Sequence, residues 1–221
     1  MRKVTLGLLV LGCWTSAYAQ PVGSWLIQGG MTRIAPNVSS GSLGAPSPSG
    51  TTIDVGGDTK VTGQITYILN EQWSVAIPLG LGFRHKLYGN GSISGVGQIG
   101  TVDALPATVY GQYRFFEPSA QWRPYAMLGV SYVQFRNAQG SSALNGLNPA
   151  NPPGGSTGLS VANTWALNPG LGLSVKLDDR WFVDVSWARS LLRTTSTLST
   201  GQKIESTLNP DVFSIGVGLR Y

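Results

Sequence analysis

The last thirteen residues of the chain, 209–221, alternate between two kinds of side chain. Counting back from the end, every second residue is apolar, and the set is Phe213, Ile215, Val217, Leu219 and Tyr221. The residues between them are small or polar, except for one valine. Because successive side chains of a strand point to opposite faces, this segment is predicted to be a ribbon with one apolar face. A soluble sheet would bury that face under a second layer, so the rest of the chain must supply either such a layer or more ribbons.

The rest of the chain supplies seven more segments with the same alternation, at 22–34, 58–69, 73–84, 105–116, 123–136, 164–177 and 181–191. Short connections alternate strictly with long segments rich in Gly, Ser, Thr, Asn and Pro. The short connections are 70–72, 117–122 and 178–180, and the long ones are 36–57, 89–100, 137–163 and 192–202. This rhythm predicts an all-β fold, an eight-stranded antiparallel transmembrane barrel with four long extracellular loops and three short periplasmic turns.

Aromatic residues mark the ends of the predicted strands, as in the interfacial girdles of membrane barrels. Trp73, Trp122, Trp181 and Tyr221 lie toward the short connections, and Phe83, Phe135, Trp165 and Trp187 toward the long ones. A soluble eight-stranded barrel would also alternate, but it would keep its apolar face inside and its charges outside. Here the polar members are small, scarce and on one face, which favours the membrane.

Composition supports this interpretation. Charged residues make up 11% of the chain, where about a quarter is usual, and hydrophobic residues make up 42%. After the N-terminal segment there is no apolar run of about 20 residues, so no transmembrane helix is expected. The 15 basic and 10 acidic side chains are too evenly balanced to indicate nucleic acid.

The N-terminal residues 1–19 are predicted to be a cleaved secretory signal peptide, which leaves 20–221 as the barrel. Arg2 and Lys3 precede an apolar run, and Ala17-Tyr18-Ala19 forms a small-x-small cleavage site. Cys13, the only cysteine, raises the alternative of a lipoprotein signal, against which the bulky Leu11 two places earlier argues. Without Cys13 the chain has no thiol for a disulfide or metal site.

Several motifs resemble the OmpW family of small outer-membrane barrels. They are Phe83-Arg84-His85-Lys86, Leu105-Pro106, Arg123-Pro124-Tyr125, Leu208-Asn209-Pro210 and the terminal 216–221, in order and at comparable spacing. The resemblance implies a barrel in the outer membrane of a Gram-negative bacterium, with a narrow, largely apolar lumen that passes small hydrophobic molecules. It implies neither a cofactor nor covalent chemistry.

The chain departs from the family pattern at three places. It ends in Tyr221 where phenylalanine is more usual, and 189–193 is basic where relatives are often acidic. Pro78 and Ala188 stand where some relatives carry bulky apolar constrictions, which predicts a wider interior or one of different shape. We still expect Phe213 and Tyr221 to signal to the barrel-assembly machinery.

The inward positions of the predicted strands give two sets of candidate residues. The ligand-facing set is Leu26, Pro78, Tyr110, Met127 and Ala188, and the charged set is Arg84, Arg114, Asp184 and Arg220. Isolated charge in a narrow lumen is costly, so we expect the charged set to form a paired plug rather than an ion path.

Pro78 and Pro106 lie on neighbouring predicted strands, close to Gly80 and Gly82. Proline lacks the N–H that a strand ladder needs. This seam is therefore a candidate lateral exit into the bilayer, with a strand end or a bulge as the alternative.

Two other functions remain open from the sequence. The cluster Arg84-His85-Lys86 suits contact with lipopolysaccharide phosphates, so a structural barrel with a filled lumen whose loops contact lipopolysaccharide or host factors is one alternative. The other is a lipid-modifying enzyme in which His85, the only histidine, acts with Ser92 and Asp103. The sequence leaves the oligomeric state open.

Overall fold

The computed structural model describes residues 23–45, 47–147 and 157–221. The predicted signal peptide lies outside these residues. Within them, no helix is both long enough and apolar enough to cross a membrane.

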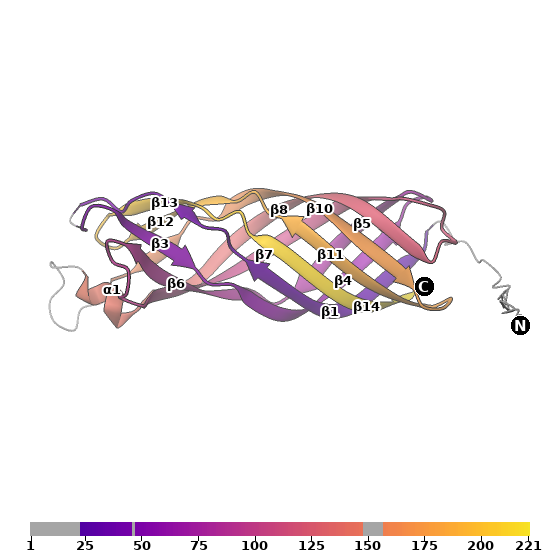
Figure 1. The fold of residues 1–221 in the computed structure, drawn as a ribbon, viewed down its shortest axis with the longest axis horizontal. Helices are drawn as coiled ribbons and strands as arrows, with labels where there is room; N and C mark the ends of the chain where they lie inside the picture. The colour runs from indigo at the N-terminus through magenta and orange to yellow at the C-terminus, as the bar shows by residue number, and fades with distance from the viewer. Residues whose placement is uncertain (1–22, 46, 148–156) are drawn as a thin grey trace, which may run out of the picture.

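The strands form a closed antiparallel barrel, elongated along one axis (Figure 1). Two of its strands, β5 (Trp73–Gly80) and β6 (Phe83–Gly91), both pair with β7 (Gln98–Arg114) and together make one wall position. The wall therefore has eight positions, and the predicted eight-stranded barrel is confirmed. The first strand closes on the last, since the amides of Trp25 and Tyr221 each donate to the other's carbonyl oxygen at 2.9 Å. The wall strands are β1 (Trp25–Ala35), β4 (Asp58–Ile68), β5 (Trp73–Gly80), β6 (Phe83–Gly91), β7 (Gln98–Arg114), β8 (Trp122–Gly140), β10 (Thr164–Lys176), β11 (Trp181–Arg189) and β14 (Asp211–Arg220).

The predicted long loops carry more structure than expected. A short strand, β3 (Thr51–Val55), pairs with β6, and a separate small sheet has the order β2 (Ser39–Ser40), β13 (Lys203–Thr207), β12 (Arg193–Leu198) and β9 (Leu159–Val161). A single helical turn, α1 (Ser142–Gly146), lies in the same region. These strands lie beyond the apolar band, where an outward face need not be apolar, and they are rich in Ser and Thr. The period-2 hydrophobic signal is therefore absent from them, which explains why the sequence predicted irregular loops.

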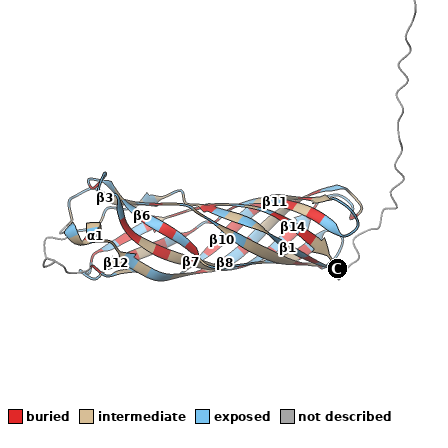
Figure 2. Cartoon of the chain, turned by 90° about the horizontal axis from the view of Figure 1, so that it is seen from below, coloured by how far each residue is buried: buried red, intermediate tan, exposed pale blue. Residues whose placement is uncertain are grey.

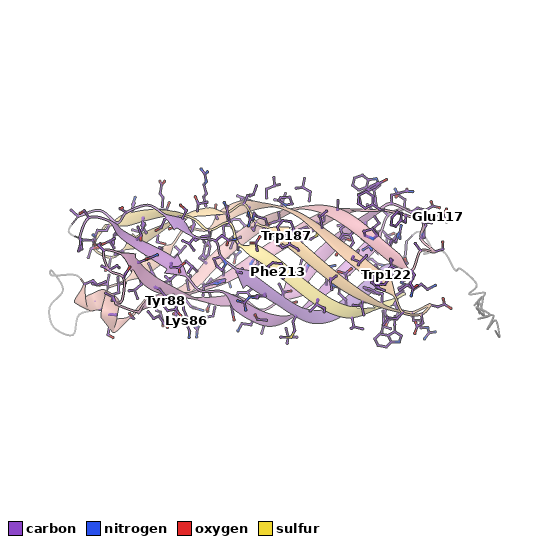
Figure 3. All side chains as sticks on the ribbon, in the orientation of Figure 1. Lys86, Tyr88, Glu117, Trp122, Trp187 and Phe213 are labelled. Carbon is purple, nitrogen blue, oxygen red and sulfur yellow. The ribbon has the colours of Figure 1, made fainter. Side chains whose placement is uncertain are left out.

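Aromatic side chains divide the barrel along its long axis. Trp122 lies toward the short-turn end, Trp187 and Phe213 lie near mid-length, and Lys86 and Tyr88 lie toward the long-loop end (Figure 3). Exposed apolar side chains such as Leu128 and Ile215 occupy outward positions between the two aromatic levels. The wall on the loop side of Trp187 therefore extends beyond the apolar band.

The outward and inward phases reverse between β5 and β6. Trp73 faces Tyr113 on β7, but Phe83 faces Ala104, so the register is displaced by one residue between the two pieces. A shift of one residue exchanges the two faces of a strand. Phe83 is consequently buried rather than part of the outer girdle, and Arg84 is exposed. The prediction that Arg84 belongs to the lumen plug is wrong for this reason.

Three large aromatic side chains inside the barrel lie over glycines of a neighbouring strand. Tyr110 lies over Gly129, Tyr125 over Gly172 and Phe182 over Gly218, each so close that an added Cβ would meet the ring. Buried and exposed residues alternate along the same strands (Figure 2). The inward glycines thus provide the space that the large aromatic side chains occupy.

We predict that Gly172→Ala destabilises the barrel by about 1–3 kcal/mol, because overpacking forces side chains out of their preferred rotamers. A Cβ at Gly172 would stand 2.2 Å from the Tyr125 ring. The free energy of unfolding would be measured by urea titration in lipid vesicles. Gly29→Ala is the matched control, since a Cβ there has no atom within 4 Å. Equal stability of the two variants would contradict the packing argument.

Candidate functional site

A polar cluster fills the lumen toward the short-turn end. Arg114 donates from Nε to Ser74 Oγ and from Nη2 to Gln112 Oε1, both at 3.0 Å. Ser74 also donates to Gln112 at 3.0 Å. All three side chains are at most 2% exposed. We call this group, together with Tyr125 and Asp184, the lumen plug.

Asp184 supplies the negative charge of the plug. It accepts hydrogen bonds from Tyr125 Oη at 2.8 Å and from Ser174 Oγ at 2.6 Å. The Arg114 guanidinium carbon lies 5.1 Å from the centre of the Tyr125 ring, a cation–π arrangement. Arg114 and Asp184 thus share one enclosed network, in which each charge has hydrogen-bond partners. The sequence did not assign Gln112, Tyr125 or Ser174 to the plug, although their inward phase on β7, β8 and β10 was the available signal.

Two predicted residues lie at the same end of the lumen but outside this network. Leu26 packs with Ile68 and Phe182 in a small buried apolar cluster, so it does not face the cavity described next. Arg220 is partly buried, and its Nε has no hydrogen-bond partner among the described residues.

Above the plug the lumen opens into a cavity of about 160 Å³. Four of the predicted ligand-facing residues line it, namely Pro78, Tyr110, Met127 and Ala188. A smaller cavity of about 50 Å³ follows among the loops, and Ile53 and Leu87 border both. The two cavities therefore adjoin each other, one among the loops and one inside the barrel.

The wall of the main cavity is interrupted between β5 and β7. Pairing stops at Ala76 opposite Tyr110 and resumes on β6 with Phe83 opposite Ala104. Over the same stretch β5 stays paired with β4, out to Gly80 opposite Thr62. The interruption is therefore confined to one seam.

Two prolines account for the interruption. Arg114 N donates to Gln72 O across this seam, so every second residue of β5 from Gln72 turns its amide and carbonyl groups toward β7. Continued in the same register, Pro78 would face Thr108 and Gly80 would face Pro106. Each of these pairs would need two hydrogen bonds, and each proline removes one because it has no N–H. Half of the ladder bonds at this point cannot form.

The cavity lies directly behind this seam. Its lining includes Leu79, Leu81 and Leu105 beside the inward-facing Pro78 and Pro106. Leu81 is 82% exposed on the outer face of the barrel. Gly80 also lines the cavity, whereas Gly82 does not.

The candidate enzyme residues do not meet. The Nδ1 atom of buried His85 donates to the Gly56 carbonyl oxygen at 2.8 Å, and Ser92 shares a hydrogen bond with Thr51 at 3.0 Å. Asp103 accepts from Asn137 and from Arg84, which together hold the pKa of its carboxyl below the usual range. Within residues 23–45, 47–147 and 157–221, no three His, Cys, Asp or Glu side chains gather as a metal site would require.

Comparisons with known proteins agree with the geometry. The sequence profile of the OmpW family matches residues 21–221. Outer membrane protein W of Vibrio cholerae is 27% identical over 100% of both chains. The dibenzothiophene metabolism operon protein PahQ of Pseudomonas aeruginosa is 23% identical, also over 100% of both. The crystal structure of the outer membrane protein OprG from Pseudomonas aeruginosa superposes with a TM-score of 0.81 at 20% identity, covering 92% of this chain and 98% of that one.

We predict that the barrel loses stability as the pH falls below about 6.5 because of His85. Burial lowers the pKa of this imidazole, against the opposing effects of Gly56, Asp58 and Asp103. The unfolded chain therefore takes up the proton first, and protonation favours unfolding by at most about 1.4 kcal/mol per pH unit. Urea titrations from pH 7.5 to 5 should give a steeper decline for the native chain than for His85→Gln. Parallel curves would contradict the assignment to His85.

We also predict that Asp184→Asn costs about 3–5 kcal/mol of unfolding free energy, because it leaves Arg114 buried without its compensating charge. Asp179→Asn is the control, since the Asp179 side chain is 67% exposed where it pairs with Lys176 at 3.0 Å. An exposed pair of this kind is worth about 0–1 kcal/mol. Similar midpoints for both variants would show that the plug does not depend on its charge.

Proposed function

Because this chain belongs to the OmpW family of outer-membrane proteins, we propose that it admits small hydrophobic molecules at the extracellular end and releases them sideways into the bilayer. The molecule enters between the loops, passes Ile53 and Leu87, and occupies the lumen cavity. The plug of Arg114 and Asp184 closes the periplasmic direction. The molecule leaves through the interrupted seam between β5 and β7.

The observation that carries this proposal is that the lumen cavity lies directly behind the interrupted stretch of the wall, where outward residues belong to its lining together with inward ones. Tyr110 and Met127 border it from inside, and Leu79 and Leu81 from the outer face. Removal of two donors by Pro78 and Pro106 weakens this seam, since each missing bond lowers the cost of separating the strands.

The name of one relative supports the chemical class. PahQ is named for a dibenzothiophene metabolism operon, and dibenzothiophene is a fused, apolar aromatic molecule. The apolar lining near the loop end of the cavity, including Val55, Val102 and Val133, suits a molecule of that kind.

A second candidate function has an observation of its own on the outer surface. Arg84, Lys86 and Arg136 are exposed on β6 and β8 above the apolar band, and Asp103 between them pairs with Arg84 at 2.9 Å. Lys86 projects from the barrel there (Figure 3). Clustered cations at this height suit the phosphates of lipopolysaccharide. This contact is compatible with hydrophobic uptake and does not need an open lumen.

Phe213 and Tyr221 are exposed on the outer face, and their recognition by the barrel-assembly machinery stays a prediction.

We predict that the double variant Pro78→Val/Pro106→Val slows uptake of a hydrophobic dye several-fold, because valine restores both missing donors and lets the seam close. Protein refolded into liposomes would be mixed with the dye, and entry would be followed by fluorescence. Each single variant should show a smaller effect.

Pro169→Val is the matched control, because Pro169 also lacks an N–H but faces β11 at a different seam and does not line the cavity. It should take up dye at the native rate. Native rates in the double variant would remove the lateral exit from the proposal, and absence of dye entry through the native protein would remove the uptake function itself.

A further inference from the structure

Six polar side chains line the cavity in two hydrogen-bonded clusters. In the first, which we call the β1 cluster, Thr32 bonds Thr62 at 2.7 Å and Ser214 at 2.9 Å. In the second, the β8 cluster, Ser131 bonds Thr108 at 2.6 Å and accepts from Asn168 Nδ2 at 2.7 Å. All six residues belong to the lining of the main cavity.

The two clusters lie on opposite walls. The β1 cluster spans β4, β1 and β14, and the β8 cluster spans β7, β8 and β10. In the closed eight-position wall, β8 is the fourth neighbour from β1 in both directions, so the centres of the two clusters face each other across the lumen. The cavity thus has a polar waist, formed by these two clusters.

Each cluster keeps hydrogen-bonding capacity after its internal bonds are made. The three hydroxyls of the β1 cluster carry three protons and make two bonds among the described residues, which leaves one O–H donor. In the β8 cluster one hydroxyl proton and one amide proton of Asn168 remain, together with the Asn168 carbonyl oxygen. Asn168 and Ser131 are almost fully enclosed, at 2% and 3% exposure. A ligand in the cavity is therefore the natural partner of these groups.

The waist suits neutral polar groups and not ions. Among the described residues that line the main cavity there is no Asp, Glu, Lys or Arg, and its histidine, His85, is held neutral by burial. An ionised ligand group would lose its water without gaining an opposite charge. A hydroxyl, carbonyl or undissociated carboxyl group loses little, because the clusters replace the bonds it made to water.

We propose that the cavity selects amphiphilic molecules that carry one uncharged oxygen group on an apolar body, such as phenols and medium-chain alcohols, over the parent hydrocarbons. This inference rests on the proposed uptake function and names its substrate class. The apolar body lies against Val102, Val133 and Leu87 on the loop side, and the oxygen group lies at the waist. A bare hydrocarbon at the waist leaves the cluster donors and acceptors without partners, which is the means by which polar sites reject analogues lacking a hydroxyl.

The test compares 2-naphthol with naphthalene, which differ by one hydroxyl group. Displacement of a bound hydrophobic dye gives the affinity of each compound for the refolded native protein, corrected for its partition into protein-free vesicles. We expect the native chain to favour 2-naphthol by about threefold to tenfold, the range of one net hydrogen bond. Thr32→Val/Ser131→Ala should bring this ratio close to one, because 2-naphthol then loses its hydrogen-bond partners.

The matched control is Thr52→Val/Ser160→Ala, which removes two hydroxyls from loop strands outside the main cavity and should keep the native ratio. Ser131→Ala alone provides a milder variant if the double change lowers the folded fraction, and it should shift the ratio in the same direction. A native ratio of one, or a ratio that the waist variants leave unchanged, would overturn the substrate class while dye uptake stands. Binding of neither compound, with no dye entry, would overturn the uptake proposal itself.

Discussion

The wall of this barrel depends on one constraint, which is that no backbone N–H or C=O group can be left without a partner in lipid. Closure of β1 on β14 removes the open edges, and the wall strands then have a neighbour on each side, except along the interrupted stretch between β5 and β7. Closure also fixes which side chains face inward, because the pairing register sets the phase of each strand. The mostly polar residues of the eight alternating segments therefore point into the lumen. The pairing of the wall strands thus decides which polar groups line it.

The lining of the lumen changes along the barrel axis, from charged groups through neutral hydroxyls to apolar side chains. At the periplasmic end, Arg114 and Asp184 are enclosed in a shared network, where the hydrogen bonds offset part of the desolvation of both charges. At the waist, neutral hydroxyls bond each other and keep spare capacity. Near the loops, the lining becomes apolar, with Leu87, Val102 and Val133 in one buried cluster. Only the middle and upper levels offer a ligand both space and suitable contacts.

The alternation in the sequence was sufficient to predict the fold class, the strand order and most of the inward set. It could not predict the one-residue register shift between Leu81 and Phe83, because a shift depends on how β5 and β6 meet β7 and not on local pattern. Every assignment past that point on the same segment was reversed, which is why Arg84 was placed in the lumen. Leu26 does point into the lumen, as predicted, but it lies below the cavity, next to the plug. Alternation predicts which face of a strand a residue is on, and not which residues it meets across the lumen. The hydroxyl clusters were likewise invisible as clusters, because their members come from six strands.

The position of the interrupted seam is consistent with the energetics of a hydrophobic cargo. A fused two-ring aromatic buries on the order of 200 Å², so its return to periplasmic water would cost about 5 kcal/mol. Passage sideways into the bilayer avoids that cost, whereas passage downward would also require the Arg114–Asp184 network to open. The seam occurs beside the waist, since Thr62 faces Gly80 across β4 and β5 and Thr108 lies on the stretch of β7 that has no partner in β5. A molecule with one oxygen group can therefore keep a hydrogen-bond partner until its apolar body has reached lipid, which joins the selectivity of the cavity to the direction of exit.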